Sequence, residues 1–170
     1  VPTKLYSRNS EVDDKNDHAL EELEEKYEKA TGEELEFEQY DMKTTTRDLK
    51  CPDYKIANAM KNCIAPIEMQ LCVGAQVMLL TNMFEGEGDE RKLILSNGSP
   101  GKVVSFRSSD GIPRVIFSNG LTREIEMHSF EVYEENNKEV PFIVVSQIPL
   151  RLAYAITIHK SQGLTLDRAE

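Results

Sequence analysis

Residues 147–163 read QIPLRLAYAITIHKSQG, and this stretch decides which fold is expected for the chain. The apolar run Leu152–Ile156 is typical of a strand buried on both faces, as found in parallel sheets covered by helices. The polar residues Thr157–Gly163 then bring hydroxyl, imidazole, ammonium and amide groups to the point where the strand turns into a helix. Free backbone N–H groups at a helix start bind phosphate oxygens well. An ordinary capped helix start with a solvated lysine is the alternative, because Ser and Thr are common at that position.

The region before this strand has a different pattern, made of short strand-like runs. Asn-Gly, Asp-Gly and Pro residues separate the runs, and these residues favour tight turns. Five or six short strands at this spacing predict a small barrel of the SH3-like or OB type. The expected strands are 67–71, 75–80, 101–106, 114–117, 122–127 and 142–147.

The first seventy residues alternate between helical and extended patterns. Lys4–Tyr6 is a candidate strand, and Ser10 has the character of a helix N-cap followed by acidic residues. Apolar residues at helical spacing then predict a helix that Gly32 ends. Beyond it we expect a strand at 34–40, a loop at 44–53 and a short helix at 54–63.

This order of elements predicts the fold class. A helix-and-strand segment precedes the barrel and a core strand follows it, so the barrel interrupts one sheet-containing domain. We therefore expect an α/β fold with an inserted all-β module. The expected divisions are 1–70 for the first part of the α/β domain, 71–146 for the barrel, and 147–170 for the return strand and its loop.

Composition and charge limit the classes of function. The 170 residues contain 20 Lys and Arg against 30 Asp and Glu, for a net charge of −10, so net charge gives no argument for nucleic-acid binding. No apolar run is long enough to cross a bilayer, and the start lacks a signal peptide, so a soluble, intracellular protein is expected. Three widely spaced cysteines and three scattered histidines predict reduced structural thiols and no metal site.

The sequence also lacks the parts of an independent nucleotide hydrolase. Gly98–Lys102 resembles the end of a phosphate-binding P-loop, but the motif requires a glycine where Ser96 stands and Ser or Thr where Val103 stands. The acidic pair Asp89-Glu90 does not follow an apolar strand. No set of residues for nucleophilic catalysis stands out, so we assign no catalytic residue.

Several segments together resemble one family, the Pif-type (petite-integration-frequency) DNA helicases, which are relatives of RecD in helicase superfamily one. Residues 2–13 with Asn16 resemble the motif IV of that family, and 147–167 are similar to its motif V almost without a gap. Residues 71–82 and 96–104 are similar to the entry into its inserted barrel. The resemblance covers the first twenty residues and everything from about Glu68 onward.

The resemblance implies part of an ATP-driven, 5′-to-3′ DNA helicase. This part would be a partial RecA-like domain, the second of two, interrupted by an SH3-like barrel before motif V. The implied partners are single-stranded DNA and a first RecA-like domain, with ATP and Mg²⁺ used by the parent protein and none bound to this chain alone. The implied DNA-backbone contacts are Thr157, His159, Ser161, nearby Lys160 and, from motif IV, Asn9; the implied contacts to the ATP phosphates are Gln162 and Gly163.

The family also implies a cellular setting. It indicates genome maintenance, including DNA repair, recombination and telomere maintenance, in the nucleus or mitochondrion if the source is eukaryotic. A monomer without membrane contact is expected. Two alternatives stay open at this point: a non-catalytic SH3-like module that binds a protein partner, and a piece of a RecD-like or transposon-borne helicase.

Overall fold

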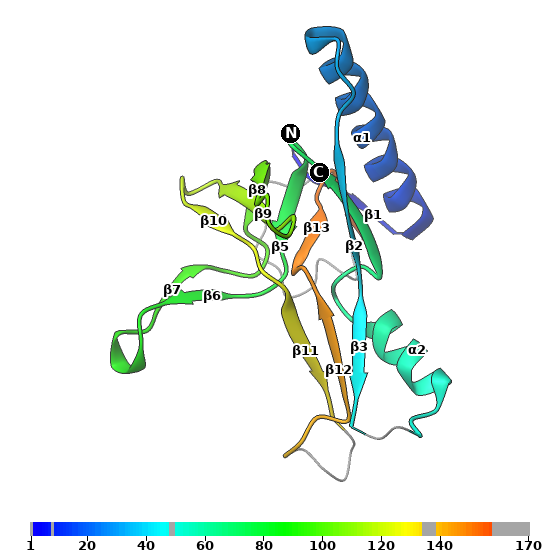
Figure 1. Cartoon of the computed structure of the whole chain (residues 1–170), viewed down its shortest axis with the longest axis vertical. Coiled ribbons are helices and arrows are strands. Elements are labelled where there is room, and N and C mark those ends of the chain that lie inside the picture. Colours follow the sequence, from blue (N-terminus) through cyan, green and yellow to red (C-terminus); the bar gives the residue numbers. More distant parts are fainter. Residues whose placement is uncertain (1, 8, 48–49, 134–138, 158–170) are drawn as a thin grey trace.

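The computed structural model describes residues 2–7, 9–47, 50–133 and 139–157 (Figure 1). Both α-helices lie among strands in the N-terminal part of the described chain, and strands dominate from β4 onward. In chain order the elements are β1 (Lys4–Tyr6), α1 (Asn9–Thr31), β2 (Phe37–Asp41), β3 (Lys43–Thr46), α2 (Asp53–Asn62), β4 (Glu68–Cys72), β5 (Gln76–Leu79), β6 (Met83–Glu85), the 3₁₀ turn η1 (Gly88–Glu90), β7 (Lys92–Leu95), β8 (Pro100–Phe106), β9 (Pro113–Phe117), β10 (Thr122–Glu124), β11 (His128–Val132), β12 (Ile143–Gln147), β13 (Leu150–Leu152) and β14 (Ala155–Thr157).

The largest sheet has five antiparallel strands in the order β10-β9-β8-β5-β13. Its strands alternate buried and exposed residues, as in β9, where Val115 and Phe117 face the core while Arg114 and Ile116 face solvent. The strands predicted at 101–106 and 114–117, from strand-like runs between turn signals, correspond to β8 and β9. The mixed α/β architecture with an all-β module confirms the expected fold class.

The remaining strands form smaller sheets beside this one. β11, β12 and β3 make a three-stranded antiparallel sheet against which α2 packs, and β2 pairs with β4. β6 and β7 form a hairpin that projects from the body (Figure 1). β1 and β14, from opposite ends of the described chain, form a parallel pair.

Helix α1 packs one face against the strands. Val12, Asn16 and Leu20, spaced four residues apart, are its buried residues. The helix ends as predicted, because Gly32 adopts φ 74° and its N–H donates to the Glu28 carbonyl at 2.8 Å. The predicted N-cap was wrong: the helix includes Asn9, so Ser10 lies within its first turn rather than before it.

One hydrophobic core connects parts of the chain that are far apart in sequence. Leu20, Leu35 and Met69 from the N-terminal elements pack in one cluster with Val103 and Leu150. Residues from all three expected divisions therefore share a core, and the boundaries at 70 and 146 stay a prediction. The cysteines are free thiols, and burial in this core raises the pKa of Cys72 to about 11.

Several strand predictions were wrong in their details. The expected loop at 44–53 contains most of β3, and the hairpin strands β6 and β7 on either side of Asp89-Glu90 were not predicted. β11 was not predicted. The single core strand expected at 152–156 is two strands, because β13 pairs with β5 of the large sheet whereas β14 pairs with β1. A change of partner within one apolar run has no local sequence signal.

A buried glutamine lies where β12 meets β13. Gln147 is fully buried, and its Nε2 donates to the carbonyls of Tyr40, Pro66 and Ile67 at 3.2, 3.0 and 3.3 Å. Its Oε1 accepts the N–H of Ile148 at 2.9 Å. The side chain thus joins the end of β12 to β2, through Tyr40, and to Pro66 and Ile67, which precede β4.

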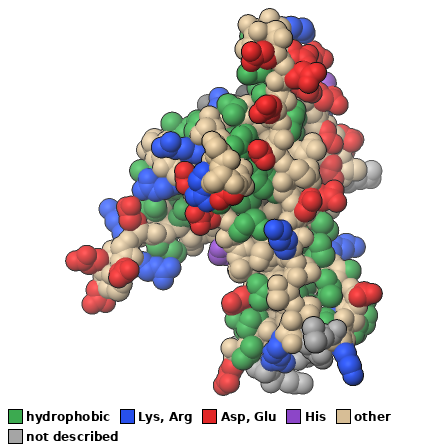
Figure 2. Space-filling model, viewed as in Figure 1, with side chains coloured by type: hydrophobic (Ala, Val, Ile, Leu, Met, Phe, Trp, Pro, Cys, Tyr) green, Lys and Arg blue, Asp and Glu red, His purple; other side chains and the backbone are tan. Residues whose placement is uncertain are grey.

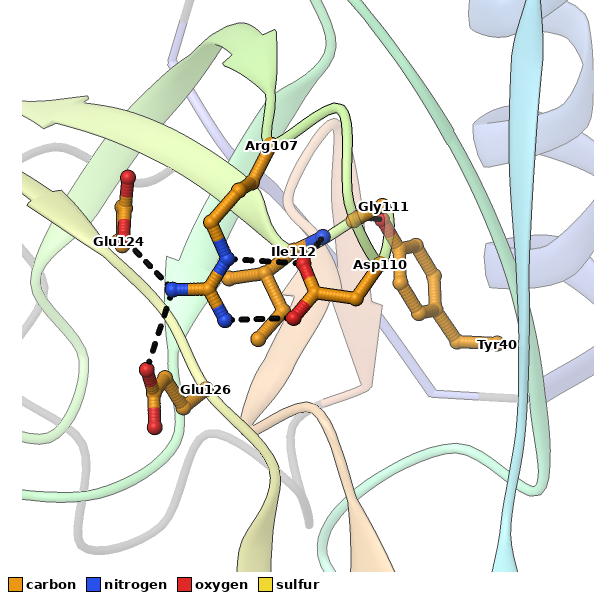
Figure 3. Close-up of polar contacts among 7 residues, drawn as sticks. All are labelled: Tyr40, Arg107, Asp110, Gly111, Ile112, Glu124 and Glu126. Atoms are coloured by element: carbon orange, nitrogen blue, oxygen red, sulfur yellow. Dashed lines mark hydrogen bonds and ion pairs between the residues drawn. The ribbon is translucent and has the colours of Figure 1, made fainter.

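The turn between β8 and β9 is held by an arginine (Figure 3). Arg107 donates to both carboxylate oxygens of Asp110, at 2.8 and 2.6 Å, and also to Glu124 and Glu126, at 2.9 and 3.3 Å. The Asp110-Gly111 turn was predicted, and Gly111 has φ 69°. The Tyr40 hydroxyl donates to the Gly111 carbonyl at 2.5 Å, which attaches this turn to β2.

Candidate functional site

The candidate site is built on the parallel pair of β1 and β14. The register places Lys4 beside Ala155 and Tyr6 beside Thr157. The carboxyl ends of parallel strands lie at the same edge of a sheet, where ligands bind in α/β folds. β1 leads through Ser7 towards α1, which begins at Asn9, and Thr157 ends β14. The start of α1 and the end of β14 are therefore brought to one edge.

Three contacts fix β14 in this place. The Asn16 side chain accepts the N–H of Ala155 at 2.9 Å and donates to its carbonyl at 3.2 Å. The Thr3 hydroxyl donates to the Ala153 carbonyl at 2.8 Å, and the Lys4 N–H donates to the Tyr154 carbonyl at 3.0 Å. Thr3 and Asn16 are 4% and 7% exposed, so these bonds form away from competing water.

A groove of about 610 Å³ runs beside α1. Arg151 lies in it and donates to the Ile64 carbonyl at 3.2 Å. Burial lowers the pKa of this guanidinium, and the nearby Asp13 carboxylate opposes that effect. Burial, together with Asp13 and Asp14, raises the pKa of Asp17 above its ordinary value. With acidic groups at its wall, the groove does not by itself favour phosphate.

A second groove, of about 680 Å³, lies between α2 and the β11–β12 strands. Its lining is largely apolar and aromatic, and the Lys55 ammonium lies 4.8 Å from the centre of the Phe142 ring. Within the described parts of the chain, no group of three or more His, Cys, Asp and Glu residues could hold a metal ion.

Charge is unevenly distributed over the surface. Acidic side chains gather along α1, whereas basic ones gather over the β8–β10 part of the large sheet (Figure 2). Lys102 and Arg114 are exposed on β8 and β9. No helix in the described ranges is long and apolar enough to span a membrane.

The structure places two of the seven predicted site residues. Asn9 is exposed as the first residue of α1 and lines the groove beside that helix, and the backbone of Thr157 ends β14. The backbones of the two residues lie towards the same edge, and their proposed roles stay predictions. His159, Lys160, Ser161, Gln162 and Gly163 lie outside the described residues, and their roles stay predictions.

Sequence reasoning assigned no role to Thr3, Asn16 or Arg151, which shape the site. Asn16 had a detectable signal, because it is a polar residue within the buried stripe that runs from Val12 to Leu20. A polar side chain at such a position requires a hydrogen-bond partner. Thr3 and Arg151 had no comparable signal.

Comparison with known proteins gives a consistent result. No protein-family model matches the chain. The ATP-dependent DNA helicase PIF1 of Rattus norvegicus is 33% identical over 174 residues, which include all of this chain and 23% of the relative. The Homo sapiens protein of the same name gives the same identity and shares. The chain thus spans about a quarter of the length of these curated relatives.

Solved structures share the fold. The Pif1 helicase of Candida albicans matches with a TM-score of 0.70 and 26% identity, over 99% of this chain and 38% of that one. A Bacteroides Pif1 bound to single-stranded DNA matches with a TM-score of 0.56 and 24% identity, over 99% of this chain and 33% of that one. Because its sequence identity is below 25%, the match to the Bacteroides structure shows only a shared fold.

Proposed function

The chain belongs to the Pif1-type helicases, and we propose that the protein containing it is an ATP-dependent DNA helicase. The proposed activity is movement along single-stranded DNA in the 5′-to-3′ direction, with separation of duplexes ahead. The relatives that match the chain over its whole length are named ATP-dependent DNA helicases. Because the chain covers a quarter of those relatives, the activity is proposed for the longer protein.

The observation that carries this proposal is the parallel pairing of β1 with β14. It places the segment similar to motif IV beside β14, which belongs to the segment similar to motif V. The two segments thereby reach a single sheet edge. Asn9 at the start of a 23-residue helix and Thr157 at a strand end both lie there. Such an edge combines free helix N–H groups with polar side chains, which suits phosphate groups.

We assign the polar residues at this edge to two kinds of phosphate. Asn9, Thr157, His159, Lys160 and Ser161 are proposed to contact the DNA backbone. Such contacts position DNA without reading its sequence, which a motor that moves along any sequence requires.

Gln162 and Gly163 are proposed to face the ATP phosphates and to couple hydrolysis to movement. The Mg²⁺ ligands and the phosphate-binding loop are assigned to the first RecA-like domain, outside this chain. ATP supplies the phosphoryl-transfer chemistry there, and this chain supplies contacts and coupling.

The test compares two substitutions in the full-length protein. His159→Ala should weaken equilibrium binding to single-stranded DNA by roughly 2- to 100-fold, because it removes one hydrogen bond or charge-assisted contact. Gln162→Ala should leave DNA binding within about twofold and slow DNA-stimulated ATP hydrolysis and unwinding. DNA binding, ATPase rate and unwinding are measured for both.

Matched controls come from the described chain. His128→Ala on β11 and Gln70→Ala on β4 make the same chemical changes away from the strand edge. Both should behave as the unsubstituted protein. Equal losses of the same functions in His159→Ala and Gln162→Ala would contradict the two roles, and the absence of DNA-stimulated ATPase in the unsubstituted protein would contradict the helicase proposal itself.

A further inference from the structure

Asn16 makes an unusual contact for a helical side chain, because it bonds to both polar groups of one residue in a strand. Its Oδ1 accepts the Ala155 N–H at 2.9 Å and its Nδ2 donates to the Ala155 carbonyl at 3.2 Å. The side chain is 7% exposed. A buried amide that is bonded in this way cannot be displaced without leaving polar groups unsatisfied.

The contact falls on the edge of β14 that faces away from β1. In parallel pairing, Lys4 lies beside Ala155 and its N–H bonds to the Tyr154 carbonyl. The N–H and carbonyl of Ala155 therefore point to the opposite side. Among the described strands only β1 pairs with β14, and Asn16 takes the place of a second strand at this residue.

Asn16 also fixes the helix relative to the strand. Val12 and Leu20, one turn away on either side, are buried and make apolar contacts, which are non-directional. The paired hydrogen bonds of Asn16 define one position of α1 along β14. Thr157 follows Ala155 by two residues, roughly 7 Å along the strand, so the Asn16 contact lies within the segment similar to motif V and close to the end of its strand β14.

We propose that Asn16 is a positioning residue for motif V. It acts through β14, and its two hydrogen bonds with Ala155 set where the end of this strand, at Thr157, stands relative to DNA and nucleotide. Asn16 itself touches neither ligand. The inference rests on the helicase function proposed above, and it adds a residue from motif IV that determines the coupling made by motif V.

The test uses the full-length protein with two substitutions at this position. Asn16→Leu removes both hydrogen bonds at similar volume, whereas Asn16→Asp keeps an oxygen that accepts the Ala155 N–H. Asn58→Leu and Asn58→Asp, on the exposed face of α2, are the matched controls. Hydrogen exchange of peptides covering 150–157, thermal melting, and the kcat and KM of DNA-stimulated ATP hydrolysis are measured for each.

Positioning predicts a specific combination of results. In Asn16→Leu the exchange of the 155–157 backbone should rise and kcat should fall on the order of tenfold, with the KM for ATP within about twofold and the folded fraction unchanged. Asn16→Asp should protect the Ala155 amide and lose less activity than Asn16→Leu. The Asn58 variants should match the unsubstituted protein in every measurement.

Other results separate the two proposals. If the unsubstituted protein is active and Asn16→Leu keeps its kcat while exchange rises, Asn16 holds the strand without setting the coupling, and the inference is wrong. It is also wrong if activity falls only in proportion to the folded fraction. If the unsubstituted protein hydrolyses no ATP in response to DNA, the proposed function fails, and the positioning role fails with it.

Discussion

The five-stranded sheet and the β1–β14 pair are stabilised in different ways. In the large sheet, Val77, Leu79 and Val115 are completely buried within a core that many elements share. The parallel pair has a small cluster in which Met78, Ala153 and Ile156 are buried and Leu5 packs at the margin. Hydrogen bonds add to this cluster: Asn16 bonds to Ala155 of β14, and Thr3 and Lys4 bond to Ala153 and Tyr154 just before it.

The difference shows how stability and placement are divided in this chain. Apolar burial contributes most of the free energy of folding but tolerates small displacements of the packed groups. Directed hydrogen bonds contribute less free energy and fix a geometry. The strand that enters the candidate site is held by the second kind of contact. The predictions below test whether this contrast holds.

The largest effect is expected in the five-stranded sheet. Leu79→Ala should lower the free energy of unfolding by about 2–5 kcal/mol, because it leaves a cavity at a fully buried position. Leu5→Ala, at a half-buried position on β1, should cost about 1 kcal/mol. Urea unfolding followed by circular dichroism measures both. Equal losses in the free energy of unfolding for the two variants would show that the two regions are not stabilised differently.

An intermediate effect is expected from a single hydrogen bond just before β14. Thr3→Val removes the hydroxyl that donates to the Ala153 carbonyl, which keeps a bond from Gln76 Nε2 at 3.0 Å. The free energy of unfolding should fall by about 0.5–1.5 kcal/mol. Thr3→Ser retains the hydroxyl and is the control. A loss as large as that of Leu79→Ala in the same urea titration would show that β14 is not the weaker region.

The smallest effect is expected at the exposed Arg107–Asp110 pair, and it depends on pH. The hydrogen bond from Arg107 lowers the pKa of Asp110 from 3.8 to about 2. The folded state therefore favours the charged carboxylate, and its stabilisation is complete above about pH 4 and is lost as pH falls from 4 to 2. Both side chains are partly exposed, so solvent screening keeps the effect small.

Melting temperatures measured between pH 6 and pH 2 test this linkage. Asp110→Asn should have a shallower decline below pH 4 than the unsubstituted protein. Asp89→Asn, an exposed substitution in the turn η1 of the β6–β7 hairpin, is the control and should keep the full decline. Identical declines in all three proteins would argue against a contribution from the Arg107–Asp110 pair.

Sequence predicted the elements whose signals are local. The end of α1 follows from one glycine, and the burial of β9 follows from strict alternation around Val115. β3 could not be predicted because it is the polar run Lys43–Thr46, and it forms a strand through pairing with β12, about a hundred residues later. The division between β13 and β14 likewise depends on which distant strand each one meets.

The candidate site shows the same limit. The strand end at Thr157 was predicted from polar residues after an apolar run, whereas the predicted helix start at Ser10 fell too late, because α1 already includes Asn9. The hydrogen bonds that Thr3 and Asn16 make with Ala153 and Ala155 were not predicted, because these partners lie 150 and 139 positions away in the sequence. Distant backbone partners cannot be identified from a single sequence, although a polar residue in a buried helical stripe indicates that a partner exists.

The buried Gln147 has a mechanical consequence for the molecule. Its amide is bonded to three carbonyls from two earlier segments and to the next backbone N–H. A movement of the β11–β12–β3 sheet relative to the β2–β4 pair would stretch these bonds together, in a place that water does not enter to replace them. The end of β12 is therefore tied to its position beside β2 and the residues before β4.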